Sequence, residues 1–146
     1  MEKILNKQVR ILMRKHQNIV QNYLSKLGLY MGQPRLLFYL EEAPGISQRE
    51  LSEMLDITKE ATSVSIRRLE KSGFIERKAC TKDRRMNLLN LTSQGYDVVK
   101  NLRLNFDEIN SLMFVDLNDN DKKELQRIIS IMNESLEKRL RDEEAI

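Results

Sequence analysis

The sequence predicts a mainly α fold of the α+β class, with six helices and one two-stranded β-hairpin. Long segments near both ends of the chain carry apolar residues at spacings of three and four, the period of a helix that buries one face. Near the middle, two short helical segments are separated by about three residues and are followed by two strand-like segments. A chain of 146 residues, 40% of them hydrophobic, suffices for one domain with a substantial core.

The first segment is expected to form a long helix that ends near Gly28. A short helix should follow Pro34 and stop at residues 43–45, which read Ala-Pro-Gly. The residues that share one face of the first helix are Leu5, Val9, Leu12, His16, Ile19, Val20, Tyr23 and Leu27.

Two short helices are expected next, and both begin at residues that favour the N-cap position. Ser47 is expected to cap the first, which runs to Leu55, and Thr58 the second, which covers residues 58–72 and stops at Gly73. The turn between them is short and the second helix is basic, so the pair has the outline of a helix-turn-helix.

Residues 74–78 and 86–91 are expected to form the hairpin strands, with the polar stretch 79–85 as its tip. Thr92 should cap a long helix, and a last helix should follow residues 116–121. The first helix and the last two are long and carry more apolar surface than the small middle module can cover, so pairing with a second copy of the chain is expected. A monomeric helical bundle is the alternative.

Charge is distributed unevenly along the chain. Residues 58–85 hold nine Lys and Arg against four acidic residues, a net charge of +5, whereas residues 101–146 hold seven basic and eleven acidic residues, a net charge of −4. A concentrated positive segment suits an element that faces phosphates, although a solvated face with an incidental bias is the alternative.

Several classes of protein are not expected. No apolar run is long enough to cross a bilayer, and the first residues do not resemble a signal peptide, so a reducing cytoplasm is the expected location and no membrane partner is expected. No catalytic set or phosphate-binding loop is visible, which argues against an enzyme. One histidine and one cysteine, far apart, make neither a metal site nor a disulfide, and no cofactor is expected.

The helix over residues 58–72 is expected to read DNA in the major groove. Opposite its apolar positions it presents hydroxyl, methyl and cationic groups, which suit base edges, thymine methyls and phosphates respectively. Arg68 has two open interpretations, a phosphate contact or an anchor within the module. The expected DNA contacts of the whole chain are Ser47, Gln48, Lys59, Thr62, Ser63, Val64, Arg67, Arg68, Lys71, Lys82, Asp83, Arg84 and Arg85.

Residues 32–95 resemble the MarR (multiple antibiotic resistance regulator) family. The resemblance rests on residues 47–52 (SQRELS), on residues 61–77 (ATSVSIRRLEKSGFIER), and on residues 83–95, which follow the family pattern D-x-R-x-x-x-V/L-x-L-T-x-x-G. Many members carry a long polar or basic residue at the position of Val64, so the resemblance does not supply the base preference.

The resemblance implies a homodimeric transcriptional regulator that acts as a repressor, with a winged helix-turn-helix in each subunit. It implies one domain over residues 1–146, with residues 1–31 and 96–146 as dimerisation helices and residues 32–95 as the DNA-binding region. The two recognition helices would enter successive major grooves of a near-palindromic double-stranded site. Arg85 would insert into the flanking minor groove, where negative potential is concentrated, and Asp83 would brace the tip.

Family members also bind small aromatic or anionic effectors, and the resemblance implies such a partner here, with His16 and Tyr23 as candidate contacts. For both residues the alternative is ordinary packing. Some family members sense oxidants through a cysteine near the N-terminus, and this chain has no cysteine there, so that mechanism is not expected. Cys80 in the hairpin is either an incidental thiol or a site whose modification disturbs DNA contact. A winged-helix module that binds another protein is the alternative function.

Overall fold

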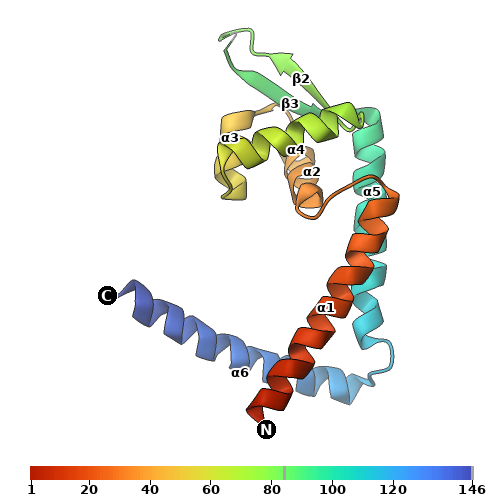
Figure 1. Cartoon of the computed structure of the whole chain (residues 1–146), viewed down its shortest axis with the longest axis vertical. Coiled ribbons are helices and arrows are strands. Elements are labelled where there is room, and N and C mark those ends of the chain that lie inside the picture. The colour runs from red at the N-terminus through yellow and green to blue at the C-terminus, as the bar shows by residue number, and fades with distance from the viewer. Residues whose placement is uncertain (84, 146) are drawn as a thin grey trace. The chain divides into compact units, whose positions relative to one another are not determined.

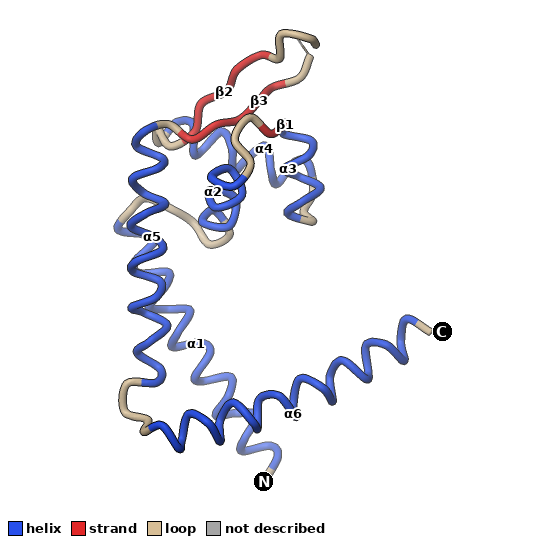
Figure 2. Tube along the Cα trace, turned by 180° about the vertical axis from the view of Figure 1, so that it is seen from behind, coloured by secondary structure: helices blue, strands red, loops and turns tan. Residues whose placement is uncertain are grey.

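The computed structural model describes residues 1–83 and 85–145, and within these residues it contains six α-helices, one 3₁₀ helix and a three-stranded sheet (Figures 1 and 2). The chain divides into two compact units, Met1–Ile109 and Asn110–Ile146, which are described in turn. The expected order of helices and hairpin is confirmed. The elements are α1 (Glu2–Lys26), α2 (Gln33–Glu42), β1 (Ile46–Ser47), α3 (Gln48–Leu55), α4 (Lys59–Lys71), β2 (Ile75–Ala79), β3 (Asn87–Leu91), α5 (Ser93–Ser111), η1 (Leu112–Phe114) and α6 (Asp119–Glu144).

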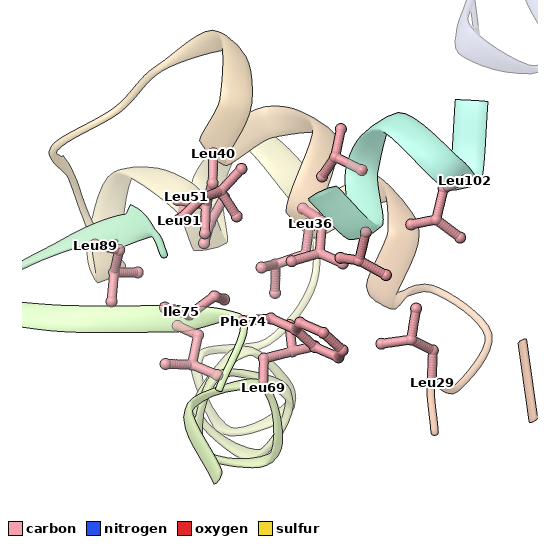
Figure 3. Packing of buried hydrophobic residues seen from close by; sticks show 14 of the residues in the cluster. Leu29, Leu36, Leu40, Leu51, Leu69, Phe74, Ile75, Leu89, Leu91 and Leu102 are labelled. Carbon is pink, nitrogen blue, oxygen red and sulfur yellow. The ribbon is translucent and has the colours of Figure 1, made fainter. Parts of the chain in front are cut away.

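The first unit is built around one apolar core (Figure 3). Its buried side chains begin near the end of α1 and continue through α2, α3, α4 and the sheet to the first half of α5. The period of each helix explains this, since α4 turns Ile66 and Leu69 inward, both at 1% exposure or less, while α2 contributes Leu36, Leu37 and Leu40. The core therefore fixes α3 and α4 against the sheet.

The sheet has the strand order β1-β3-β2, and both pairings are antiparallel. The hairpin pairs Ile75 with Leu91 and Ala79 with Asn87, so its strands lie within one residue of the predicted bounds. The predicted two-stranded hairpin is confirmed, and β1 adds a third strand that was not predicted, in which Ile46 pairs with Leu89. A strand of two residues carries no alternating pattern that the sequence could reveal.

Side-chain caps and one glycine determine where α4 begins and ends and where α5 begins. Thr58 Oγ1 accepts from the amide of Ala61 at 3.1 Å, as expected of an N-cap. At the other end of α4, Gly73 has φ +83° and the amide of Phe74 donates to the Leu69 carbonyl at 3.0 Å, so the helix closes in a Schellman motif. Thr92 then starts α5 by accepting from the amide of Gly95 at 3.0 Å.

Aromatic side chains join α1, α2 and α5. The ring of Phe106 packs edge-on against Tyr23 and Phe38, with centroid distances of 6.1 and 6.3 Å. The guanidinium of Arg103 covers Phe38 at 4.6 Å and donates to Glu41 at 3.1 Å. These contacts hold the second half of α1 against the module.

The second unit contains α6, which begins with a capping box between Asn118 and Asp121. No side chain of α6 is buried among the residues that the structure describes. An open groove of about 780 Å³, with Phe114, Val115 and Leu125 in its lining, runs beside η1 within this unit. None of the helices in the described ranges combines the length and the apolarity that crossing a bilayer requires.

Candidate nucleic-acid interface

The outer face of α4 carries the side chains that were expected to contact bases. Lys59, Val64 and Arg67 are exposed, and Ser63 is half-buried. Val64 and Arg67 lie on the side of α4 away from Ile66 and Leu69, so the core holds one face of the helix while the other stays open to solvent; Lys59 is exposed in the first turn, and Ser63 lies at the edge between the two faces. A helix supported in this way presents a fixed set of groups to a groove.

Two of the residues expected to contact DNA lie inside the module instead. Thr62 is fully buried at 0% exposure, because it precedes Ile66 by four residues and shares its inward face, and its hydroxyl donates to the Thr58 carbonyl at 3.0 Å. Ser47 is 4% exposed, and its hydroxyl accepts from the amide of Glu50 as the N-cap of α3. The assignment of these two hydroxyls to DNA was therefore wrong.

Gln48 joins α3 to α4 and to the hairpin. Its Nε2 donates to Ser63 Oγ at 2.6 Å, and its Oε1 accepts from Arg77 Nη1 at 3.4 Å. The guanidinium of Arg77 is held in turn by Glu70 on α4, to which its Nε donates at 2.9 Å. The carboxylate and the guanidinium are both about 30% exposed, at 30% and 28%, so the pair is shielded from much of the solvent.

The structure favours one of the two interpretations of Arg68. Its guanidinium lies 4.6 Å from the centre of the Tyr30 ring, in the segment between α1 and α2. This cation–π contact is the internal anchor that was one of the alternatives. Lys71, one turn further along, is exposed at the end of the helix.

The hairpin tip is organised by Asp83. Its Oδ1 accepts from the amide of Arg85 at 3.0 Å, and the Arg85 Nε lies 3.9 Å from the same oxygen. The Arg85 side chain is 96% exposed, so it is free to enter a groove, and Lys82 beside it is also exposed. Below the tip, the amide of Cys80 donates to the Met86 carbonyl at 2.9 Å, which closes the hairpin. Arg84, which was also expected to contact DNA, lies outside the described residues.

The two candidate effector contacts lie two turns apart on α1, and both are half-buried. The Tyr23 hydroxyl donates to the Asn101 carbonyl at 3.3 Å. Burial raises the pKa of the Tyr23 phenol above its usual value, and a hydrogen bond with the Asn105 side chain opposes this shift. The phenol is therefore neutral at physiological pH and acts as a hydrogen-bond donor. Within residues 1–83 and 85–145, no cluster of His, Cys, Asp and Glu has the composition of a metal site.

Glu70 and Arg77 were not identified from the sequence as part of the interface. They lie seven residues apart, on either side of the helix stop at Gly73, and no local spacing rule pairs a helix end with the strand that follows it. The cation count of residues 58–85 included Arg77 but could not distinguish a structural arginine from one that faces DNA.

Comparisons with known proteins agree with this geometry. The model of the MarR family matches residues 27–86. The transcriptional regulator BilQ of Clostridium symbiosum is 30% identical over 117 residues, which cover 80% of this chain and 81% of that protein. A MarR transcriptional regulator from Methanosarcina mazei has a similar solved structure, with 27% identity, a TM-score of 0.68 and coverage of 93% of this chain and 98% of that one.

A second solved structure has the same fold and was determined with nucleic acid. It is the F27L mutant of MepR from Staphylococcus aureus bound to an oligodeoxyribonucleotide, with 22% identity, a TM-score of 0.70 and coverage of 90% of this chain and 97% of that one.

Proposed function

This chain belongs to the MarR family of transcriptional regulators, and from this premise we propose that it acts as a homodimeric repressor released from its operator by a small effector. Family membership makes it a regulator of transcription rather than an enzyme. The dimer, the sign of regulation and the effector are parts of the proposal.

The observation that carries the proposal is the chemistry of two exposed elements of the first unit, the outer face of α4 and the hairpin tip. They present Lys59, Val64 and Arg67 on a rigid helix, and Arg85 on a braced tip. Cations for phosphates beside groups for base edges are what sequence-specific binding of double-stranded DNA requires. We expect the first one or two turns of α4 to enter the major groove and Arg85 to enter the minor groove.

The apolar side chains of α1 and α6 support a dimer. They are large, exposed and arranged in stripes, which a monomer in water would leave unfavourably hydrated. A second copy that covers them would also bring two recognition helices to one duplex about 34–36 Å apart, one helical turn of DNA. The exposed members are Ile4, Leu5, Val9, Ile11, Leu12, Met13 and Ile19 of α1 and Ile128, Ile129, Ile131, Met132, Leu136 and Leu140 of α6.

Repression and effector release follow from the same arrangement. A dimer that occupies a near-palindromic site in a promoter excludes polymerase without any further component. A small aromatic or anionic molecule that binds near His16 and Tyr23 on α1 would change the spacing of the two reading surfaces. The expected place of action is the cytoplasm, where the regulator would reach the promoters that it controls.

Selection of bound fragments from the source genome, followed by a salt titration on the selected duplex, tests the proposal. A dimer that makes about 6–10 phosphate contacts should lose about 10³–10⁵-fold in affinity between 50 and 200 mM salt. Enrichment of one inverted repeat with this slope supports a DNA-binding dimer. A flat salt response with no enriched sequence would instead favour a winged-helix module that binds another protein.

A further inference from the structure

A hydrogen-bonded network of four polar side chains links α4, β2 and α3 and ends at Ser63 on α4. Glu70 accepts from Arg77, Arg77 donates to Gln48 Oε1 at 3.4 Å, and Gln48 Nε2 donates to Ser63 Oγ at 2.6 Å. The network begins at Glu70 on α4, passes through Arg77 on β2 and Gln48 on α3, and returns to α4 at Ser63, two turns before Glu70. All four residues belong to the first unit.

The direction of these bonds is determined by Arg77. A guanidinium has only donors, so the end of the Gln48 amide that faces it must be the oxygen. The amide NH₂ is then turned toward Ser63, and the serine oxygen must accept. Glu70 maintains this arrangement, because its carboxylate binds the Nε and Nη2 of Arg77 and leaves Nη1 for Gln48.

The hydroxyl proton of Ser63 has no acceptor in the helix backbone among the described contacts. Ser130 and Ser135 on α6 return their hydroxyl protons to the carbonyl four residues earlier, at 2.9 and 3.1 Å. The carbonyl of Ser63 is engaged by Arg67 Nε at 3.4 Å, but its hydroxyl takes part only as an acceptor from Gln48. The proton of this half-buried hydroxyl is therefore not committed to an acceptor among the described residues.

We propose that Arg77, acting through Gln48, makes Ser63 a hydrogen-bond donor toward DNA and so makes this position select a base that presents an acceptor. This inference rests on the proposed function, since it assumes that α4 enters the major groove. A free serine hydroxyl pairs with donors and acceptors alike, and so discriminates weakly. A serine whose oxygen already accepts favours thymine O4, guanine O6 and N7 or adenine N7, and it disfavours cytosine, whose only hydrogen-bonding group in the major groove is the N4 donor. Gln48 and Arg77 are positioning residues in this scheme.

The test compares thymine with 5-methylcytosine in the selected duplex, using the full-length protein. The position to modify is the one at which Ser63→Ala removes the base preference. Both bases carry the same methyl group, so the methyl contact available to Val64 does not change. On the modified strand O4 is exchanged for the N4 amino group, and the paired purine changes from adenine to guanine in every comparison, so each variant is judged by how it changes the wild-type ratio of the two affinities. The wild-type protein should bind the thymine duplex about 5-fold more tightly, the value of one hydrogen bond.

Gln48→Glu should reverse this preference. A carboxylate accepts from both Arg77 and Ser63, so the serine proton turns inward and the serine oxygen offers a lone pair to the DNA. The ratio of the two affinities should then favour 5-methylcytosine. The added negative charge weakens binding to both duplexes equally and cancels in the ratio. Gln94→Glu, the same chemical change at an exposed position at the start of α5, is the matched control and should leave the ratio unchanged.

Arg77→Met and Arg77→Lys give a second, independent measurement. Without a cation the Gln48 amide can rotate, so Arg77→Met should bring the ratio of the two duplex affinities close to one. Arg77→Lys keeps a cation and should retain most of the wild-type preference for thymine. Loss of the Glu70 pair lowers stability in both variants, but stability alone does not change a ratio between two duplexes measured with the same protein.

Each result bears on the inference separately from the proposed function. Selective DNA binding by the wild type with a ratio that Gln48→Glu leaves unchanged would overturn the inference and leave the proposed function intact. A wild-type preference for 5-methylcytosine would do the same. Failure of the wild type to select any duplex would overturn both.

Discussion

The middle of the chain and its two ends use apolar residues in opposite ways. Between residues 24 and 102 they form one buried core, in which Leu37, Leu40 and Leu89 have 0% exposure. Most of α1 and the whole of α6 carry a comparable density of Leu, Ile and Met, yet these side chains face outward, as Leu136 does at 65% exposure. The two regions share a helical period but differ in whether a surface exists within the chain to cover the apolar face.

This difference separates two sources of stability. The core of the module closes on itself, so its folding free energy comes from contacts within one chain. The stripes on the terminal helices gain stability only when a second surface covers them, and that gain depends on protein concentration. Substitutions in the two regions should therefore be distinguishable by how their effects depend on concentration.

The largest effect is expected from Leu37→Ala in the core of the module. The substitution removes fully buried methyl groups and leaves a cavity, so the free energy of unfolding should fall by about 2–5 kcal/mol. Denaturant unfolding at several protein concentrations measures it, and the loss should not vary with concentration. A loss below about 1 kcal/mol would mean that the core at α2 is less tightly packed than described.

Gly95→Ala should also destabilise the module, by about 1–3 kcal/mol or more. A Cβ on Gly95 would lie 2.1 Å from the carbonyl oxygen of Phe74 and 3.2 Å from the Leu91 Cβ, so the start of α5 would have to move away from the sheet. Thermal unfolding measures the effect. Gln94→Ala, at the exposed neighbouring position, is the control and should change the melting temperature little.

Leu136→Lys on α6 should act on association rather than on folding. A charge within the proposed dimer interface should weaken dimerisation by about tenfold or more, which corresponds to about 1.4 kcal/mol. Sedimentation velocity over a range of concentrations measures it, with circular dichroism to show that the helices remain. Glu134→Lys places the same side chain on the opposite face of α6 and should leave the dimer intact; equal effects of both variants would contradict an interface along the apolar stripe.

The smallest effect on the protein itself is expected from Arg85→Ala. Its side chain is 96% exposed, so folding and dimerisation should not change, whereas affinity for the selected duplex should fall by about 5–10-fold. Fluorescence anisotropy titrations measure the affinity. Lys3→Ala, on the exposed start of α1, removes one positive charge outside the proposed DNA surface and serves as the comparison. An unchanged affinity for Arg85→Ala would rule out a role for the hairpin tip.

Much of the fold could be predicted because each helix carries its own local signal. Thr58 and Thr92 occupy the N-cap positions expected of them, and Gly73 ends α4 with a positive φ. β1 could not be predicted, since its only support is the pairing with β3, which lies more than 40 residues away in the chain.

The candidate site was predictable in its outline and not in its internal contacts. Thr62 was assigned to DNA because it is polar and lies on the basic helix, although its spacing to Ile66 indicates the inward face. A threonine is tolerated there because its hydroxyl bonds the Thr58 carbonyl. The links from Glu70 to Arg77 and from Gln48 to Ser63 depend on how α3, α4 and β2 pack, and such distances follow only from the tertiary structure.

The contact between Arg68 and Tyr30 has a mechanical consequence. Tyr30 lies where the chain leaves α1, and Arg68 lies near the end of α4, so one cation–π pair connects the end of a terminal helix to the helix proposed to contact DNA. A tilt of α1 that displaced Tyr30 would either break this pair or turn α4 with it. In the proposed dimer, the orientation of each α4 in its groove therefore depends on the angle between α1 and the rest of the first unit.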